Sequence, residues 1–139
     1  MANILVVDDS YLTHRLIELI LRSERHAIAA ARNGVEAVAY LEKNRVDLLI
    51  SDINMPYLDG LGLLDKVRAD KRFKDLPVIL ITASGQERIH REVQMRGACG
   101  FLTHPFSSSE LKKLVSSCLD QDEKSSSDIP RNGSCVENL

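Results

Sequence analysis

The chain has 139 residues, of which 44% are hydrophobic and 27% are charged, and its formal net charge is −2. This length predicts one domain, large enough to bury a core without help from disulfides or a structural metal. The near-neutral charge and the lack of a basic stripe argue against direct binding to nucleic acid. No apolar run reaches the roughly 18 residues that span a membrane, and the N-terminus lacks the charged lead of a signal peptide.

The three cysteines are Cys99, Cys118 and Cys135, and no two of them have the C-x-x-C spacing of a zinc or redox site. Their number is odd, and two of them lie within apolar runs. We therefore predict free thiols in a reducing compartment, and a cytoplasmic protein.

Short apolar runs alternate with amphipathic segments along the chain. Most of the short runs are continuous rather than alternating, which is typical of strands covered on both faces. The third to fifth residues of the second run are alanines, which favour helices over strands, so its pattern is the weakest. The five predicted strands are Ile4–Val7, Ala27–Ala31, Leu48–Ile50, Val78–Ile81 and Cys99–Leu102.

The first predicted helix follows Ser10, a residue type that caps helix N-termini. Its apolar residues recur at the spacing of one helical face, which amphipathic helices normally turn to the core. The members of this face are Leu12, Leu16, Leu19 and Ile20.

Four further helices show shorter stripes. Gly97 closes the third of these four, and a capping box from Ser107 to Glu110 opens the last. The stripes are Val35, Val38 and Leu41; Leu61, Leu64 and Val67; Ile89 and Val93; and Leu111, Leu114, Val115 and Cys118.

Strands that alternate with helices predict an α/β fold with a parallel sheet. From about Asp120 the composition becomes polar and rich in serine, without a periodic stripe. We therefore expect a folded domain over residues 1–119 and a disordered tail or linker over residues 120–139.

Polar side chains follow four of the predicted strands. Asp8 and Asp9 follow the first, Asp52 the third, Thr82 the fourth and His104 the fifth. Ligands of open α/β sheets bind beyond the carboxyl ends of the strands, so these side chains should meet in one crevice. Three carboxylates there would raise one another's pKa unless a hard divalent cation such as Mg²⁺ neutralised them. The alternative is that the aspartates are only helix caps and loop residues.

A carboxylate beside Mg²⁺ can attack a phosphoryl group and form an aspartyl phosphate. Such transfer needs placement and positive charge rather than covalent help from the protein. Asp52 is the candidate nucleophile, and the hydroxyl of Thr82 could donate a hydrogen bond to the phosphoryl group. In the loop after Asp52, the backbone carbonyl of Asn54 could turn back to the metal.

Four segments in order, VVDDS, SDINMPYLDG, ITAS and GACGFLTHPF, resemble the receiver domain of two-component response regulators, particularly single-domain chemotaxis regulators. The match runs from about Ile4 to Leu119. The resemblance implies a flavodoxin-like doubly wound (βα)5 fold with a five-stranded parallel sheet in the order 2-1-3-4-5. It also implies a cytoplasmic signalling phosphoprotein rather than an enzyme, with at most self-catalysed phosphotransfer and autodephosphorylation.

The resemblance assigns roles residue by residue. Asp52 would be the phosphoacceptor, Thr82 the switch hydroxyl and Phe101 the switch aromatic. The His104-Pro105 bond resembles one that is usually cis. The Mg²⁺ ligands would be Asp9, Asp52 and the backbone carbonyl of Asn54, with Asp8 assisting.

The implied phosphodonor is a sensor histidine kinase or a histidine phosphotransfer protein. An unknown target protein would bind the face formed by the predicted helix around Ile89–Val93, the strand Cys99–Leu102 and the helix around Leu111–Cys118. No direct contact with nucleic acid or membrane is expected, and the protein should be a monomer or a weak dimer.

His104 departs from the family, which has lysine at this position. Imidazole is shorter than the lysine side chain, and its charge is not assured near neutral pH. Phosphorylation could therefore survive while its link to conformational change is weakened or made pH-dependent. One alternative is a phosphorylation-independent binding module with the same fold. A metal-dependent phosphohydrolase is a further alternative, but such enzymes usually have a second aspartate where this chain has Asn54.

Overall fold

Five parallel strands form one sheet in the order β2-β1-β3-β4-β5. The structure, a computed structural model, describes residues 2–83 and 87–125. The strands are β1 (Asn3–Val7), β2 (Ala27–Ala31), β3 (Leu48–Asp52), β4 (Val78–Thr82) and β5 (Gly100–Thr103). The helices are α1 (Tyr11–Arg22), α2 (Gly34–Lys43), α3 (Gly60–Ala69), α4 (Glu87–Met95) and α5 (Ser108–Ser125). The predicted flavodoxin-like doubly wound fold is confirmed.

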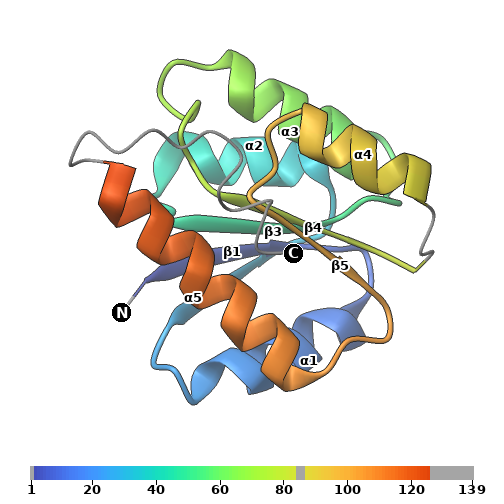
Figure 1. Ribbon diagram of the computed structural model, residues 1–139. Helices are drawn as coiled ribbons and strands as arrows, with labels where there is room; N and C mark the ends of the chain where they lie inside the picture. The colour runs from blue at the N-terminus through green and yellow to red at the C-terminus, as the bar shows by residue number, and fades with distance from the viewer. Residues whose placement is uncertain (1, 84–86, 126–139) are drawn as a thin grey trace.

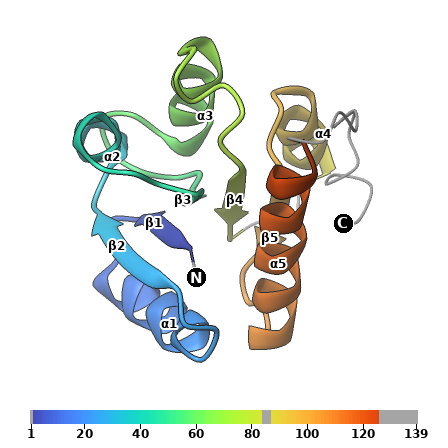
Figure 2. The ribbon, with the colours of Figure 1, turned by 90° about the vertical axis from the view of Figure 1, so that its left-hand side faces the viewer.

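Helices cover both faces of the sheet, as Figures 1 and 2 show. α1 and α5 pack on one face, and α2, α3 and α4 pack on the other. Because neighbouring residues on a strand point to opposite faces, β1 supplies both cores. Ile4 and Val6 join the core under α1 and α5, while Leu5 and Val7 join the other.

The predicted strands are confirmed, with ends that move by at most a few residues. β4 is buried throughout, and β1 and β3 are buried except at one end, in agreement with their continuous apolar runs. The alanine-rich run is β2, at the edge of the sheet, with Ala27 and Ala30 exposed. An edge strand buries less surface, so small side chains suffice there.

The predicted helix ends are also confirmed. The Ser10 hydroxyl accepts a hydrogen bond from the backbone N–H of Thr13 at 3.3 Å. At α5, Ser107 and Glu110 form the reciprocal capping box, each side chain accepting from the other's backbone N–H at 3.0 and 2.9 Å. Gly97 follows α4 with a φ of +88°, a left-handed conformation that glycine adopts without strain.

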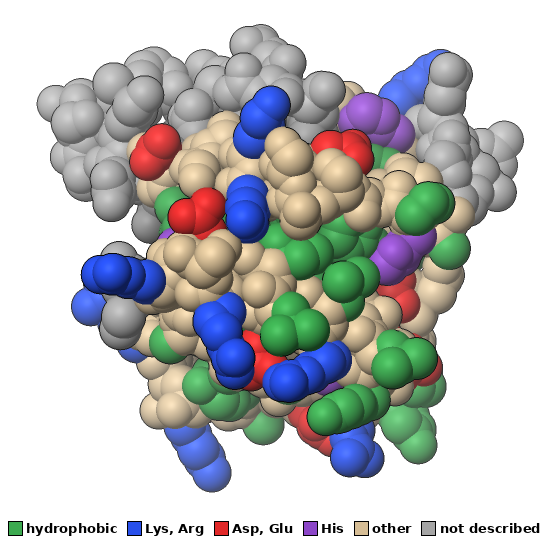
Figure 3. All heavy atoms as spheres, turned by 90° about the horizontal axis from the view of Figure 1, so that it is seen from below, with side chains coloured by type: hydrophobic (Ala, Val, Ile, Leu, Met, Phe, Trp, Pro, Cys, Tyr) green, Lys and Arg blue, Asp and Glu red, His purple; other side chains and the backbone are tan. Residues whose placement is uncertain are grey.

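The predicted packing face of α1 was wrong for its three leucines, whereas Ile20 packs against the core as expected. Leu12, Leu16 and Leu19 are 80%, 46% and 50% exposed, whereas Ile17 and Leu21 are fully buried. Figure 3, a view from below onto the side of α1, shows hydrophobic side chains gathered among lysines and arginines. Periodicity therefore identified an apolar stripe, but a different face of the helix packs on the sheet.

The prediction of free thiols was wrong for Cys99 and Cys118, which form a disulfide with Cα atoms 6.0 Å apart. Cys99 lies directly before β5, and Cys118 lies on the buried face of α5. They are 19 residues apart in sequence and meet only because α5 packs back on the sheet. Cys135 lies outside the described residues.

α5 runs to Ser125, beyond residue 119, the predicted end of the folded domain. The remainder of the predicted tail, residues 126–139, lies outside the described part of the chain. Among the described helices, none combines the length and apolar character needed to cross a bilayer.

Candidate functional site

Three carboxylates converge at the carboxyl end of the sheet. Asp8 and Asp9 directly follow β1, and Asp52 ends the neighbouring strand β3. One oxygen from each of the three carboxylates lies within 4.8 Å of the others. Asp8 is buried, Asp52 is half-buried and Asp9 is exposed, so the cluster opens to solvent on one side. We call these three residues the acidic rim.

Backbone hydrogen bonds hold two members of the acidic rim. The N–H of Asp8 donates to the carbonyl of Ala31 at 3.0 Å, and the N–H of Ser10 donates to Asp8 Oδ1 at 2.8 Å. The N–H of Asn54 donates to Asp52 Oδ1 at 3.3 Å. These contacts fix the carboxylates close to one another before any ligand arrives.

Burial and mutual repulsion act together on the acidic rim. Burial, followed by the charge of Asp8, raises the pKa of Asp52 to about 6, and Asp9 adds to the rise. Burial also raises the pKa of Asp8, against a smaller opposing effect from the N–H of Ser10. A cation held between the oxygens would reverse this repulsion, and hard carboxylate oxygens are the donors that Mg²⁺ prefers. The residues present therefore fit the predicted Mg²⁺ site.

The loop after Asp52 folds tightly back on it. The N–H of Gly60, the first residue of α3, donates to the carbonyl of Ile53 at 2.9 Å. A Cβ atom at Gly60 would collide with the backbone carbonyl of Asp52. A side chain there would therefore displace either α3 or the end of β3, and with it the Asp52 carboxylate.

Thr82 ends β4 at the same edge of the sheet. It is buried, and Ile81 beside it is in register with Asp52. Its backbone carbonyl accepts a hydrogen bond from the N–H of His104 at 2.7 Å. The ends of β4 and β5 therefore lie at the same edge of the sheet as Asp52.

Two histidines act on the acidic rim. His104 follows β5, its peptide bond to Pro105 is cis as predicted, and its ring lies 5.0 Å from that of Phe106. Its charge lowers the pKa of Asp8, and the charge of His14 does so more strongly. Both imidazoles therefore lie near enough to Asp8 to favour its charged form.

Sequence reasoning missed His14. Its Nε2 is buried, and no hydrogen-bond partner for it lies among the described residues. His14 precedes Ile17 and Leu21 by three and seven residues, so the three share the face of α1 that packs inward. Choosing that face rather than the leucine stripe would have pointed to His14.

Phe101 lies on β5 and is half-buried. It pairs with Leu80, two residues before Thr82. Its ring stacks on that of His90 from α4, with centroids 5.0 Å apart and planes inclined by 15°. Phe101 therefore joins β5 to α4.

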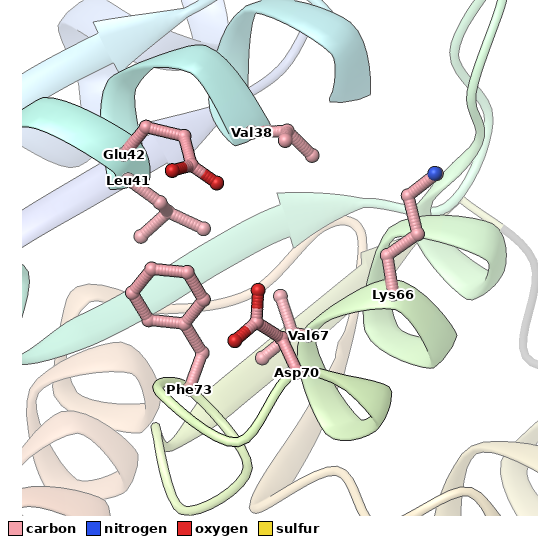
Figure 4. Close-up of a pocket in the computed structure, with 7 residues that line it drawn as sticks. All are labelled: Val38, Leu41, Glu42, Lys66, Val67, Asp70 and Phe73. Carbon is pink, nitrogen blue, oxygen red and sulfur yellow. The ribbon is translucent and has the colours of Figure 1, made fainter.

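A second group of carboxylates borders a hollow between α2 and α3 (Figure 4). Its volume is about 140 Å³, and we call it the α2–α3 hollow. Glu42 and Asp70 point into it, and both are paired with Arg72 at 2.7 Å. Hydrogen bonds from Arg72 lower the pKa of both carboxyls. The lining residues are Val38, Leu41, Glu42, Lys66, Val67, Asp70 and Phe73.

Comparison with known proteins agrees with this geometry. The family model for the response regulator receiver domain matches residues 4–116. A chemotaxis protein CheY homolog of Campylobacter jejuni is 37% identical over 118 residues, which cover 84% of this chain and 91% of that protein. A probable transcriptional regulator, ycf29 of Porphyra purpurea, is 31% identical over 132 residues, 95% of this chain but only 63% of the relative.

A solved structure adds a metal to the comparison. The receiver domain of the sensor histidine kinase PA1611 from Pseudomonas aeruginosa superposes with a TM-score of 0.78 at 27% identity. The alignment covers 86% of this chain and 98% of that domain, which was solved with a magnesium ion coordinated in its active-site cleft.

Proposed function

The chain belongs to the family of response regulator receiver domains, and from this premise we propose that it accepts a phosphoryl group on the carboxylate of Asp52. The observation that carries the proposal is the acidic rim, in which one oxygen from each of the three carboxylates lies within 4.8 Å of the others. A half-buried nucleophile beside two further carboxylates is an arrangement that needs a cation, and phosphoryl transfer uses one.

We propose that Asp9, Asp52 and the backbone carbonyl of Asn54 would hold Mg²⁺, with Asp8 assisting. When bound, it would neutralise the rim and offset the negative charge of an incoming phosphoryl group. The magnesium ion in the PA1611 receiver domain supports this assignment by analogy.

In the proposed step, an Asp52 oxygen attacks the phosphorus of a phosphohistidine on a sensor kinase or a histidine phosphotransfer protein. A P–O bond forms as the P–N bond breaks, and the electron pair of that bond leaves on the donor imidazole, which can take up a proton. The Thr82 hydroxyl would then donate a hydrogen bond to a phosphoryl oxygen. The chain acts as a phosphoacceptor rather than as an enzyme that turns over a substrate.

The proposed output is a change of the face made by α4, β5 and α5. As Thr82 moves toward the phosphoryl group, Phe101 would turn into the space released on the same side of the sheet. An unidentified protein target would read the resulting face. His104 would reach the phosphoryl group less well than lysine, so we expect His104→Lys to strengthen phosphorylation-dependent target binding and to reduce its variation with pH.

Intact mass measurement tests the proposal. The protein is incubated with acetyl phosphate and Mg²⁺, and we expect its mass to rise by one phosphoryl group. The rise should be absent when a metal chelator is present throughout the incubation. Asp52→Asn should show no gain, and Asp65→Asn, which removes an exposed carboxylate paired with Arg96, should behave as wild type. Equal labelling of Asp52→Asn and wild type would disprove the assignment.

A second candidate function follows from His104. If lysine is absent because phosphorylation is no longer used, the protein would be a receiver-like binding module that acts through the same face. It would then show no mass gain with any donor and would bind its target equally well with and without Mg²⁺ and acetyl phosphate.

We also propose a cytoplasmic, monomeric or weakly dimeric protein without direct contact with nucleic acid or membrane. Because disulfides persist mainly in oxidising compartments, a cytoplasmic location predicts that the Cys99–Cys118 bond is reduced in the cell. Alkylating cells before lysis would settle the matter: labelled thiols at both positions support a reducing cytoplasm, and protected ones do not.

A further inference from the structure

The His90–Phe101 stack is the contact that links α4 to the proposed switch aromatic. The two rings are nearly parallel, and both are half-buried, so each shields part of the other from water. His90 Nε2 also lies 3.4 Å from the side-chain amide nitrogen of Gln94, one turn further along α4. The ring is therefore held from two sides.

The sheet register places this stack on the same face as Thr82. Residues two apart on a strand point to the same side, so Leu80 and Thr82 share a face of β4. Leu80 is in register with Phe101 and Thr82 with Thr103, and Leu80 and Phe101 belong to the same core. Space released by a movement of Thr82 on this face would therefore lie within reach of Phe101.

α4 has few other attachments to the sheet. Among its described side chains, Val93 is buried and Ile89 is half-buried, whereas Arg91 is exposed. A stacked pair of rings is a substantial share of such a small interface, because aromatic pairs contribute beyond the area that they bury.

We propose that His90 is a positioning residue for the switch. It holds Phe101 against α4 in the observed position, so a turn of Phe101 into space released near Thr82 must first break the stack. His90 would thereby set how much of the protein occupies the active arrangement before phosphorylation. This inference rests on the proposed phosphorylation of Asp52, and it assigns His90 no contact with the phosphoryl group.

The test uses beryllium fluoride with Mg²⁺ as a mimic of the phosphoryl group. If His90 opposes the inward turn, His90→Ala should raise the population that is competent to bind the mimic, and its apparent affinity should rise by the same factor. The energy typical of an aromatic pair corresponds to about a two- to tenfold lower midpoint. The midpoint of the titration with the mimic is followed by ¹⁹F resonances in protein labelled with fluorophenylalanine. Three resonances need assignment, because the phenylalanines of the chain are Phe73, Phe101 and Phe106.

Two variants separate positioning from a general effect on α4. His90→Tyr keeps a ring that can stack, so it should restore the wild-type midpoint. Arg91→Ala changes an exposed neighbour on the same helix and should leave the midpoint unchanged. A ring-current change alone would move the Phe101 resonance but not the midpoint, so the midpoint decides.

The inference and the proposed function fail in different ways. If wild type binds the mimic and Asp52→Asn does not, but His90→Ala has the wild-type midpoint, His90 has no positioning role. The same conclusion follows if His90→Tyr behaves like His90→Ala. If wild type and Asp52→Asn respond alike to the mimic, the proposed function falls, and the inference about His90 falls with it.

Discussion

In the part of the chain that the structure describes, carboxylates gather at the acidic rim and at the α2–α3 hollow, and their pKa values are shifted in opposite directions at the two places. At the hollow, Arg72 bonds to both Glu42 and Asp70 and lowers the pKa of each carboxyl. At the rim, burial and repulsion raise the pKa of Asp52 and of Asp8. The hollow is compensated from within the chain, whereas the rim carries more negative charge than its neighbours offset.

This difference teaches where to look for chemistry. A compensated, exposed ion network satisfies itself and needs no ligand. An acidic group that is half-buried and left uncompensated lowers the stability of the protein unless something binds, so its presence is better explained by function than by folding.

Removing a rim carboxylate other than Asp52 should have the largest effect. Asp9→Asn takes away a proposed metal ligand while leaving the nucleophile in place. We expect phosphoryl uptake from acetyl phosphate to fall by orders of magnitude, because metal charge offsets several kcal/mol of the barrier. Glu42→Gln at the hollow is the matched control and should show wild-type uptake by intact mass. An equal loss of phosphoryl uptake in both variants would mean that the acidic rim has no particular role in phosphoryl transfer.

Magnesium should stabilise the folded protein by binding at the acidic rim, and the α2–α3 hollow should contribute nothing to this effect. At a free Mg²⁺ concentration of about 100 times its dissociation constant, the free energy of unfolding should rise by about 2.7 kcal/mol. Urea unfolding with and without Mg²⁺, at ionic strength matched with NaCl, measures this rise. Asp9→Asn should lose most of it, and Glu42→Gln should keep it. Stabilisation of all three proteins to the same degree would indicate a non-specific effect of salt.

The metal-free protein should become less stable as the pH rises through the range in which Asp52 titrates. Its pKa of about 6 in the folded state lies above the 3.8 of a free side chain. The unfolded state therefore loses its proton first, and stability falls between about pH 4 and 6. Because Asp52 is half-exposed, we expect this single group to account for about 1 kcal/mol. Asp52→Asn should lack that part of the fall, and identical pH profiles for the two proteins would contradict the raised pKa.

Sequence reasoning predicted the sheet and the rim well because both depend on short-range patterns. Continuous apolar runs defined the strands, and the rule that ligands bind at strand ends then brought Asp8, Asp9 and Asp52 together. The family resemblance supplied the strand order and the cis bond before Pro105.

What the sequence did not reveal depends on contacts between distant elements. The leucine stripe of α1 has the right period for a core face, but only packing decides which face is covered. Cys99 and Cys118 pair because α5 returns to β5. His14 lies on the inward face of α1 because Ile17 and Leu21 on that face pack on the sheet. The stack of His90 on Phe101 likewise has no signature in local sequence.

Arg72→Ala should have the smallest effect, and it tests whether burial or mere lack of compensation makes a cation site. The variant leaves Glu42 and Asp70 without their shared partner, but both carboxyls remain exposed to water, which solvates them. We expect their pKa values to return toward the ordinary range and the melting temperature to change by about 2 °C or less, since exposed ion pairs contribute little. Arg45→Ala, which removes another exposed ion pair, is the control. If Mg²⁺ now stabilised the Arg72→Ala protein more than wild type, two exposed carboxylates would suffice to bind the ion. Burial would then not be the property that makes the acidic rim, rather than the α2–α3 hollow, a cation site.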